Sequence, residues 1–465
     1  MELSQVNGNV PPPPAMTPAT NDATRAAARV ELAEASHLGE RLRRLRIAAG
    51  MTQTDLAGGR FSKEYMSQIE RGKTRPTGET VRWLAERLGV DPSLLSSGVS
   101  SAERARLEAT IARAEALSES HRYDEAIAEF GRVRADIRGG SPELELRALV
   151  GEAWTRIGRG DVAEATEQLG EAREMAESNA FSDVDRADVL FRLGVARYKV
   201  SSISSAIGLF GEALALAERS GLPCDLLRSN ILGWRSRCYR RQRDWHAARE
   251  DVQRALELAE GVSDRRTAAD VFFQASLVAE REGHWVLARK YAERAKTYYE
   301  ELSDQENVGR LLNNLGGLTY LLGHPEEAID YLKDAFRVAL ESGNQADAGM
   351  FVNSLAEVHL GIGDHEQAAA HARHALELLD GRVDYLSEIG NAQLTLGRAL
   401  FGQDHLEGAE EMFLAADRSF EQLSSASHRA AAWIALGDLA GKRGHDREAA
   451  RMYRRAAETL QDFRF

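Results

Sequence analysis

The chain has 465 residues, enough for about three ordinary globular domains or for one small domain joined to a long array of repeats. Its formal charge of −13 is unevenly distributed: residues 36–98 carry +4, residues 1–35 carry −2 and the remaining residues carry −15. Because an acidic surface repels phosphate, this distribution excludes most of the chain from nucleic-acid binding and restricts such a contact to residues 36–98.

The cysteine content and the hydropathy indicate the compartment. Cys224 and Cys238 are the only cysteines, and we expect both on one helix, about 21 Å apart, where they cannot pair with each other. No apolar run approaches about 18 residues and the N-terminus lacks a signal-peptide pattern, so no membrane partner is expected. These features predict a reduced, soluble protein of the cytoplasm.

Residues 1–35 are expected to form a disordered N-terminal extension. Five of the ten prolines lie within the first 18 residues, and residues 1–23 hold almost no large apolar side chains. Such a composition buries too little surface to offset the entropy of the chain. Residues 24–35, rich in Ala, Arg and Glu, could continue as a frayed helix into the next segment.

Residues 36–98 predict five short helices. Leu38, Leu42 and Leu45 share one face of the first helix, which is expected to end at Gly50. The fourth and fifth helices are expected in "TGETVRWLAERLG" and "DPSLLSS", where the apolar spacing again gives one buried face.

Polar residues mark the starts of the second and third helices. Thr52 can cap the second helix, with Asp55 three residues later as a weak form of the capping box. Ser62 can cap the third helix, "SKEYMSQIERG", which is expected to end at Gly72. These caps place two short helices on either side of the tight turn "GGRF".

The stretch from "MTQTDLA" through "FSKEYMSQIERGKTRP" to "LAERLGVDPSLL" closely resembles the Cro/lambda-repressor-like (XRE-type) helix-turn-helix family. It departs from that family in its turn "GGRF", which is one residue shorter than the usual form. The resemblance implies that the third helix enters the major groove of double-stranded DNA with its N-terminal residues toward the base edges.

The resemblance also implies which side chains contact DNA. Met66 and Ile69 should point into the domain, which leaves the polar side chains of the third helix outward. Lys63 could donate to guanine, Gln68 could pair with adenine and Glu64 could accept from cytosine. The alternative, that these are solvated surface residues, stays open. The full set, which includes residues placed for phosphate, is Gln53, Ser62, Lys63, Glu64, Ser67, Gln68, Lys73 and Arg75.

Residues 102–465 repeat themselves with a period of about 40 residues. One small residue recurs at intervals of 39 to 42, with another small residue 12 positions before it and a third residue, nearly always Ala, seven positions after it. Four positions after it, most repeats have a large apolar residue. The recurring residues are Ala126, Ala165, Ala206, Ala248, Ala288, Ala328, Ala368, Ala409 and Ala449.

Spacings of four and seven place these residues on one face of a helix, where small side chains let a second helix approach closely. Each unit is therefore expected to be a helix pair, and the pattern resembles a long form of the tetratricopeptide repeat. The sequence thus predicts an all-α fold: a five-helix helix-turn-helix domain followed by a right-handed α-solenoid of about nine tetratricopeptide-like repeats.

The first helices of the middle and late repeats carry polar and aromatic residues that should face a concave groove. Amide groups can pair with a peptide backbone, Arg can hold a carboxylate and aromatic rings offer apolar pockets. The alternative is that these are ordinary repeat residues. The candidates are Asn230, Trp234, Arg237, Phe273, Gln274, Arg310, Asn313, Asn314, Asn353, Asn391 and Arg398.

Two motifs carry little weight. The "GKT" at residues 72–74 lacks the preceding Gly of a phosphate-binding loop, because that position is Ser67. His365, His371 and His374 lack the Cys or carboxylate partners of a metal site. No catalytic motif appears, so neither an enzyme activity nor a metal or cofactor is expected.

A Cro-type domain followed by 40-residue repeats resembles the peptide-responsive helix-turn-helix and tetratricopeptide regulators, the RRNPP family. The resemblance implies a homodimeric transcriptional regulator that binds an inverted-repeat operator and changes its DNA affinity when a peptide or other partner occupies the groove. The alternative is an interaction scaffold whose groove holds a folded protein, with the DNA-binding domain as a tether. The sequence leaves the operator, the ligand and the sign of regulation open.

Overall fold

The computed structural model describes residues 38–137, 141–178, 180–259, 261, 264–423 and 425–461. The described residues form helices, turns and loops, with no strand among them, as the predicted all-α fold requires. The predicted disordered extension, residues 1–35, lies outside the described residues. The chain divides into two compact units, one ending at Leu222 and the other beginning at Pro223. Each unit is described by itself, and the predicted division near residues 98–102 stays a prediction.

The first unit begins with the five predicted short helices. Thr52 and Asp55 form the predicted capping box, and the Ser62 hydroxyl accepts from the Tyr65 amide at 3.1 Å. The third helix ends at Glu70, slightly before the expected Gly72, which has a left-handed backbone. The helices are residues 38–48, α2 (Gln53–Ala57), α3 (Lys63–Glu70), α4 (Gly78–Leu88) and α5 (Pro92–Ser97).

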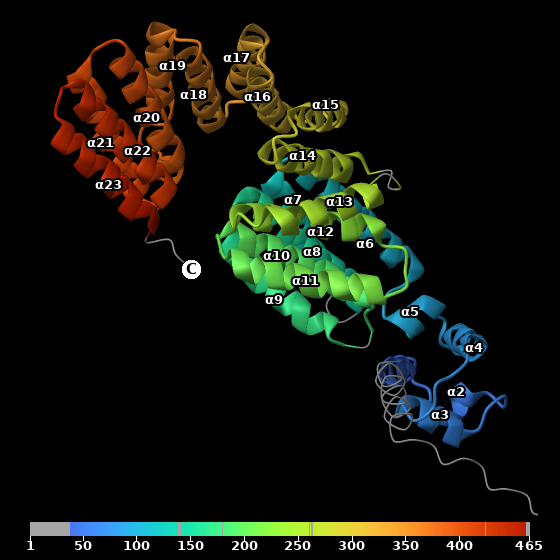
Figure 1. The fold of residues 1–465 in the computed structure, drawn as a ribbon. Helices are drawn as coiled ribbons and strands as arrows, with labels where there is room; N and C mark the ends of the chain where they lie inside the picture. The colour runs from blue at the N-terminus through green and yellow to red at the C-terminus, as the bar shows by residue number, and fades with distance from the viewer. Residues whose placement is uncertain are drawn as a thin grey trace, which may run out of the picture. The chain divides into compact units, whose positions relative to one another are not determined.

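Nine antiparallel helix pairs follow, three in the first unit and six in the second (Figure 1). The predicted number of repeats is confirmed, and the handedness of the solenoid stays a prediction. The pairs of the first unit are α6 (Ser101–Glu119) with α7 (Tyr123–Ile137), α8 (Pro142–Arg159) with α9 (Val162–Ala176), and α10 (Asp183–Lys199) with α11 (Ile203–Arg219). Those of the second are α12 (Asp225–Arg241) with α13 (Trp245–Ala259), α14 (Arg265–Arg281) with α15 (Trp285–Glu301), α16 (Gln305–Leu321) with α17 (Pro325–Glu341), α18 (Gln345–Gly361) with α19 (His365–Leu378), α20 (Leu386–Gly402) with α21 (Leu406–Gln422), and α22 (Ala426–Lys442) with α23 (Asp446–Gln461).

The two helices of each pair contact each other at the recurring small residues. The recurring Ala residues are buried in all nine repeats. A Cβ atom on Gly316 of α16 would lie 2.6 Å from Leu332 Cγ of α17, and one on Gly194 of α10 would lie 2.6 Å from a Phe210 ring atom of α11. A small residue on the first helix therefore makes room for a large apolar residue on the second.

The turn between the two helices of every repeat contains one residue in the left-handed backbone conformation, with positive φ. In each case the residue with positive φ stands five positions before the recurring Ala, so the turns share one register. Five of these residues are glycines, which adopt this backbone conformation at no steric cost. The nine are His121, Gly160, Ser201, Arg243, Gly283, Gly323, Gly363, Asp404 and Gly444.

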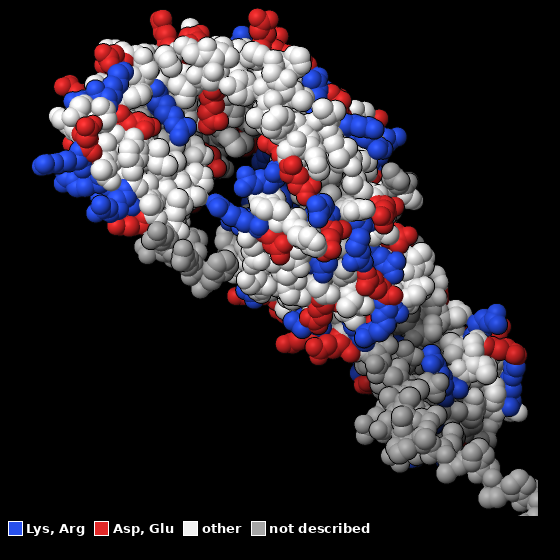
Figure 2. All heavy atoms as spheres, viewed as in Figure 1, with Lys and Arg blue, Asp and Glu red and all other residues white. Residues whose placement is uncertain are grey.

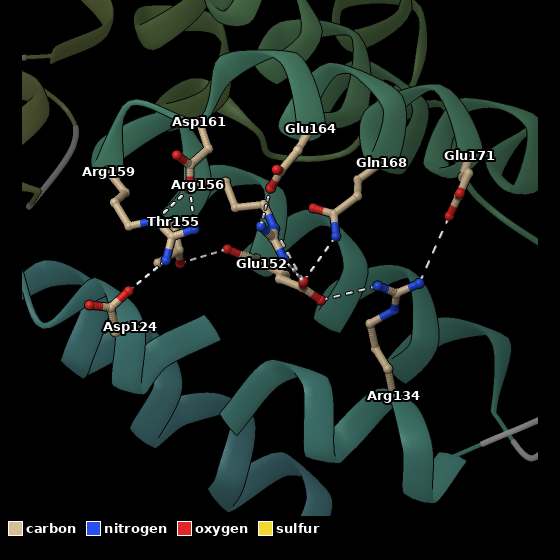
Figure 3. Close-up of polar contacts among 11 residues, drawn as sticks. Asp124, Arg134, Glu152, Thr155, Arg156, Arg159, Asp161, Glu164, Gln168 and Glu171 are labelled. Atoms are coloured by element: carbon tan, nitrogen blue, oxygen red, sulfur yellow. Dashed lines mark hydrogen bonds and ion pairs between the residues drawn. The ribbon is translucent and has the colours of Figure 1, made fainter. Parts of the chain in front are cut away.

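A buried polar network joins the second repeat to the first. Glu152 of α8 is only 4% exposed, and its carboxylate accepts from Arg134 of α7 (3.1 Å), Arg156 of α8 (2.9 Å) and Gln168 of α9 (2.9 Å). Figure 3 shows these donors converging on Glu152 from three helices. Folding thus surrounds this carboxylate with partners.

The cysteine prediction needs one correction. Cys224 occupies the N-cap position of α12 without a side-chain cap hydrogen bond, and it does not lie within the helix, which begins at Asp225. Cys238 lies inside α12, both side chains are buried, and no disulfide joins them. Burial raises the pKa of the Cys238 thiol to about 12, so it stays protonated at neutral pH.

Candidate nucleic-acid interface and repeat groove

The helix α3 is held by an apolar core. Met66 and Ile69 of α3 are fully buried, as predicted, against Leu42, Leu56 and Leu84 from the neighbouring helices. Because the buried residues lie on one side of α3, the other side is turned to solvent. The core therefore fixes which α3 side chains are available to a partner.

A buried ion pair fixes the C-terminal end of α3. The Glu70 carboxylate accepts from Arg46 at 2.5 and 3.0 Å and from the Gln53 amide at 2.8 Å, and Arg46 also donates to the Met51 carbonyl at 2.8 Å. Burial would raise the pKa of Glu70, but the hydrogen bonds from Arg46 and Gln53 outweigh it and hold that pKa below its usual value. Glu70 therefore stays charged, and it ties α3 to the first helix and to the start of α2.

Close backbone contact fixes the same end. A Cβ atom on Gly39 would lie 2.2 Å from the Ile69 carbonyl oxygen, so only glycine fits there. The sequence analysis missed Gly39, Arg46 and Glu70 as residues that position α3. Glu70 is a charged residue near the end of a predicted helix and Arg46 lies far upstream, so the sequence alone does not indicate that they pair.

The solvent-facing side of α3 carries most of the predicted DNA contacts. Lys63, Glu64 and Gln68 are exposed, whereas Ser67 is half-buried and its hydroxyl accepts from Arg71 at 2.7 Å. The Gln68 side-chain oxygen accepts from Thr74 at 3.1 Å. These exposed groups can approach base edges, and Arg71 adds a cation that the sequence analysis did not select.

The remaining predicted contacts lie around the two ends of α3. Ser62 is exposed at the N-terminus of α3, and Lys73 and Arg75 are exposed after its C-terminus. Gln53 differs from the expectation, because its amide is half-buried and bound to Glu70. This bond gives Gln53 a positioning role within the domain, and its contact with phosphate stays a prediction.

The visible face of the repeats carries charges of both signs. Figure 2 shows Lys and Arg interspersed with Asp and Glu over the visible face of the repeats. This mixture agrees with the net −15 of the chain beyond residue 98. A phosphate backbone therefore meets a more favourable net charge on residues 36–98 than on the chain beyond them.

The second unit contains a cavity of about 510 Å³ on the first helices α14, α16 and α18. Four predicted groove residues line it: Phe273, Arg310, Asn313 and Asn314. A volume of this size is typical of sites for small ligands, about 300–1,000 Å³. All of its lining residues except Leu332 of α17 come from these first helices.

Other predicted groove residues are engaged elsewhere. Asn230 accepts from Thr267 at 3.0 Å, and Arg237 donates to Asp270 at 2.8 Å with its guanidinium 4.5 Å from the Trp234 ring centre. On α20, Asn391 is half-buried and Arg398 is exposed, and neither lines the cavity.

Two predicted residues are buried beside the cavity helices. Asn353 of α18 is 7% exposed and donates to Glu357 at 3.1 Å, and Gln274 of α14 is 3% exposed. Neither lines the cavity. Asn353 therefore acts on the cavity through Glu357.

The cavity also contains residues that the sequence analysis missed. They share the helix face of the predicted ones, since Glu280 follows Phe273, and Tyr320 follows Asn313, by seven positions. Extending the predicted columns by this spacing would have found these two. The missed polar and aromatic residues and the missed methionine are Glu280, Tyr320, Met350, Ser354 and Glu357.

Charge in the cavity is only partly compensated. Arg310 pairs with Glu306 at 2.6 Å and with Asp347 at 3.1 Å. Burial raises the pKa of Glu280. Desolvation by the surrounding residues also raises the pKa of Glu357, although part of its side chain is exposed to solvent. Both carboxylates are therefore ionised less readily than in water.

The three histidines of α19 have different surroundings. His371 lies 5.3 Å from His359 between ring centres, His374 packs edge-on against Phe336 at 5.5 Å, and the His365 ring occupies the space that a Cβ atom on Gly402 would need. Within the described residues, no three His, Cys, Asp or Glu side chains are arranged to hold a metal ion. No helix in that part of the chain is long and apolar enough to cross a membrane.

Comparison with known proteins extends these observations. Residues 37–97 match the model of a helix-turn-helix domain, and residues 269–341 match the model of the tetratricopeptide repeat. The HTH-type transcriptional regulator DdrOP3 of Deinococcus deserti is 43% identical over 63 residues, which cover 13% of this chain and 49% of that protein. The uncharacterized HTH-type transcriptional regulator y4dJ of Sinorhizobium fredii is 43% identical over 54 residues, covering 11% of this chain and 70% of that protein. The chain thus spans about half the length of the first relative.

Solved structures resemble the repeats. The apo form of the quorum sensor NprR from B. thuringiensis superposes with a TM-score of 0.59 at 13% identity, covering 76% of this chain and 99% of that chain. At this identity the similarity concerns the fold. It agrees with nine helix pairs that form a repeat solenoid.

Proposed function

This chain belongs to the helix-turn-helix transcriptional regulators, and from that premise we propose that residues 36–98 bind operator DNA while residues 102–465 sense a ligand. The chain acts in the cytoplasm as a homodimer. A short peptide in the cavity of the second unit changes its affinity for DNA. The observation that carries the proposal is the exposed polar face of α3, which a packed core and the Arg46–Glu70 pair hold in one orientation.

Selection of binding sites from randomised duplexes tests the DNA contact. Lys63→Ala and Gln68→Ala should each relax the preference at one base pair, at a cost of about 1–3 kcal/mol, because each removes a base-edge contact. Arg82→Ala is a matched control, because Arg82 is an exposed cation on α4 outside this face. If both α3 variants select the same site as the unaltered chain, α3 is not the recognition helix.

The homodimer follows from the small size of the DNA-binding part. One such domain reads few base pairs, whereas two domains read half-sites about one helical turn apart. Light scattering of the full chain, alone and with the selected duplex, should give the mass of a dimer. A monomer under both conditions would rule out the inverted-repeat arrangement.

The ligand proposal rests on the 510 Å³ cavity and on the amides of Asn313 and Asn353 beside it. Random pentapeptide mixtures should change DNA affinity, and the change requires differential binding to two states of the chain, typically 1–3 kcal/mol. Asn313→Ala combined with Asn353→Ala should abolish this response and leave basal DNA binding unchanged, whereas Gln305→Ala at the exposed start of α16 should preserve it. A chain that ignores every mixture but captures a folded protein would instead be a scaffold.

A further inference from the structure

We infer that the cavity on α14, α16 and α18 selects a ligand with a cationic group, an ammonium or a guanidinium, which binds the carboxylates of Glu280 and Glu357. This inference rests on the proposed function, in which the cavity is the ligand site. It adds the chemical class of the ligand. The argument depends on the charges, the hydrogen-bond donors and the apolar walls of the cavity.

The charged side chains that line the cavity leave a net negative charge. They are Glu280, Arg310 and Glu357. Arg310 is already paired with two carboxylates outside the lining, those of Glu306 and Asp347. An incoming anion would therefore meet two carboxylates and a cation whose charge is already compensated.

Neither glutamate has a cation of its own. Among the described residues, no Lys, Arg or His forms an ion pair with Glu280 or Glu357, and Arg240 and Arg398 act on them only at longer range. Their protein partners are neutral: Asn314 donates to Glu280 at 2.9 Å, and Asn353 donates to Glu357 at 3.1 Å. A cation that entered the cavity would supply the missing charge.

The amide side chains around the cavity donate hydrogen bonds to the glutamates, and some of their oxygen atoms have no donor. The Asn314 and Asn353 NH₂ groups are turned to the glutamates. The side-chain oxygen of Asn313, which lines the cavity, is buried and meets no donor within the described part of the chain. Buried acceptors without donors are costly, so this region calls for N–H groups from a ligand. An ammonium or guanidinium brings three to five such groups.

Apolar side chains line the rest of the cavity. Phe273, Leu277 and Met350 offer surface on which the aliphatic stem of a lysine or arginine side chain can pack. Phe273 and Tyr320 add aromatic faces, which attract cations. The walls therefore suit a long cationic side chain better than a compact inorganic cation.

Three pentapeptide pools test the inference on the full chain. Their central residue is Lys, norleucine or Glu, the other four positions are random among uncharged residues, and both ends are blocked, so that only the centre sets the charge. Immobilised protein should retain the Lys pool more strongly than the Glu pool by on the order of tenfold, as mass spectrometry of the bound fraction would measure. Norleucine should fall between them, since it keeps the stem and lacks the charge.

Matched variants identify the residues responsible. Glu280→Gln combined with Glu357→Gln should remove the preference for Lys. Glu326→Gln combined with Glu366→Gln removes the same number of charges at exposed sites on α17 and α19 and should leave the preference unchanged. Circular dichroism checks that each variant is folded. Equal retention of the Lys and Glu pools, or a preference that survives the first double variant, would overturn the inference while the proposed function stands. Retention of no pool would instead contradict the proposed function.

Discussion

Two glutamates on first helices of repeats, Glu152 in the first unit and Glu280 in the second, have opposite electrostatic surroundings. Glu152 accepts hydrogen bonds from Arg134, Arg156 and Gln168. Burial would raise the pKa of Glu152, but these bonds outweigh it and hold the pKa below its usual value. Glu280 accepts from one neutral amide, and burial raises its pKa.

The difference separates a structural carboxylate from a functional one. At Glu152, folding itself brings the partners that compensate the buried charge, so the network contributes to the fold. At Glu280, folding leaves the charge without a cation in a cavity of about 510 Å³ that a ligand can enter. Both residues are glutamates on first helices, and their partners tell the two roles apart.

The largest effect is expected from a variant that breaks the network around Glu152. Glu152→Ala should lower the free energy of unfolding by about 3 kcal/mol, because it leaves two arginines without their shared carboxylate. Glu280→Ala should cost less than about 1 kcal/mol, since it leaves only one amide unpaired. Urea unfolding, with amide hydrogen exchange in α8 and α14, measures both. Equal costs would show that the two glutamates do not differ in role.

Effects of intermediate size on stability are expected from Ala substitutions at two adjacent glycines of α16. Gly316→Ala should destabilise the chain by about 1–3 kcal/mol, because its new methyl group would meet Leu332 at 2.6 Å. Gly317→Ala meets no atom within 4 Å and should stabilise α16 by up to about 1 kcal/mol. Gly317 lines the cavity, so its variant should weaken retention of the Lys pool. Thermal unfolding and the retention assay together separate the two positions.

The smallest expected effect is a difference in pH dependence. Glu152 has a lowered pKa, so its stabilisation is present above about pH 4.3, the usual glutamate value, and is lost as the pH falls through its folded pKa. Glu280 has a raised pKa, so the folded chain binds more protons between the two values, and stability falls as the pH rises through that window. For each variant, Glu152→Gln and Glu280→Gln, the unfolding free energy is subtracted from that of the unaltered chain at every pH. The two differences, plotted against pH, should have slopes of opposite sign. Slopes of the same sign would contradict the assigned surroundings.

The sequence predicts most of the fold because its signals are local and periodic. The recurring Ala residues fix the helix pairs, and the hydroxyls of Thr52 and Ser62 mark helix starts within a few residues of the groups they bind. The site is harder to predict because its pairing depends on side chains distant in sequence. Arg46 and Glu70 are 24 residues apart, and nothing local indicates that they meet.

The predicted groove residues show the same limit. Asn313 and Arg237 look alike as polar residues on first helices, yet Arg237 is paired with Asp270 whereas the Asn313 oxygen is among the buried atoms without a partner in the described residues. Helical spacing identifies the face on which a residue lies. Whether that residue is already engaged depends on neighbours from the adjacent repeats, which the spacing does not reveal.

Because the residues with left-handed backbone conformation occupy the same position in each repeat, one repeat can be removed or added as a unit. Gly283 and Gly323 have the same backbone conformation and stand 40 residues apart, at the same distance from their following Ala. Deleting or duplicating the segment between them would join one turn to its equivalent and keep the columns of small residues in phase. Gene duplication with breakpoints at these turns can therefore lengthen or shorten the groove in steps of one repeat, and change the size of the ligand it accommodates without disturbing the DNA-binding helices.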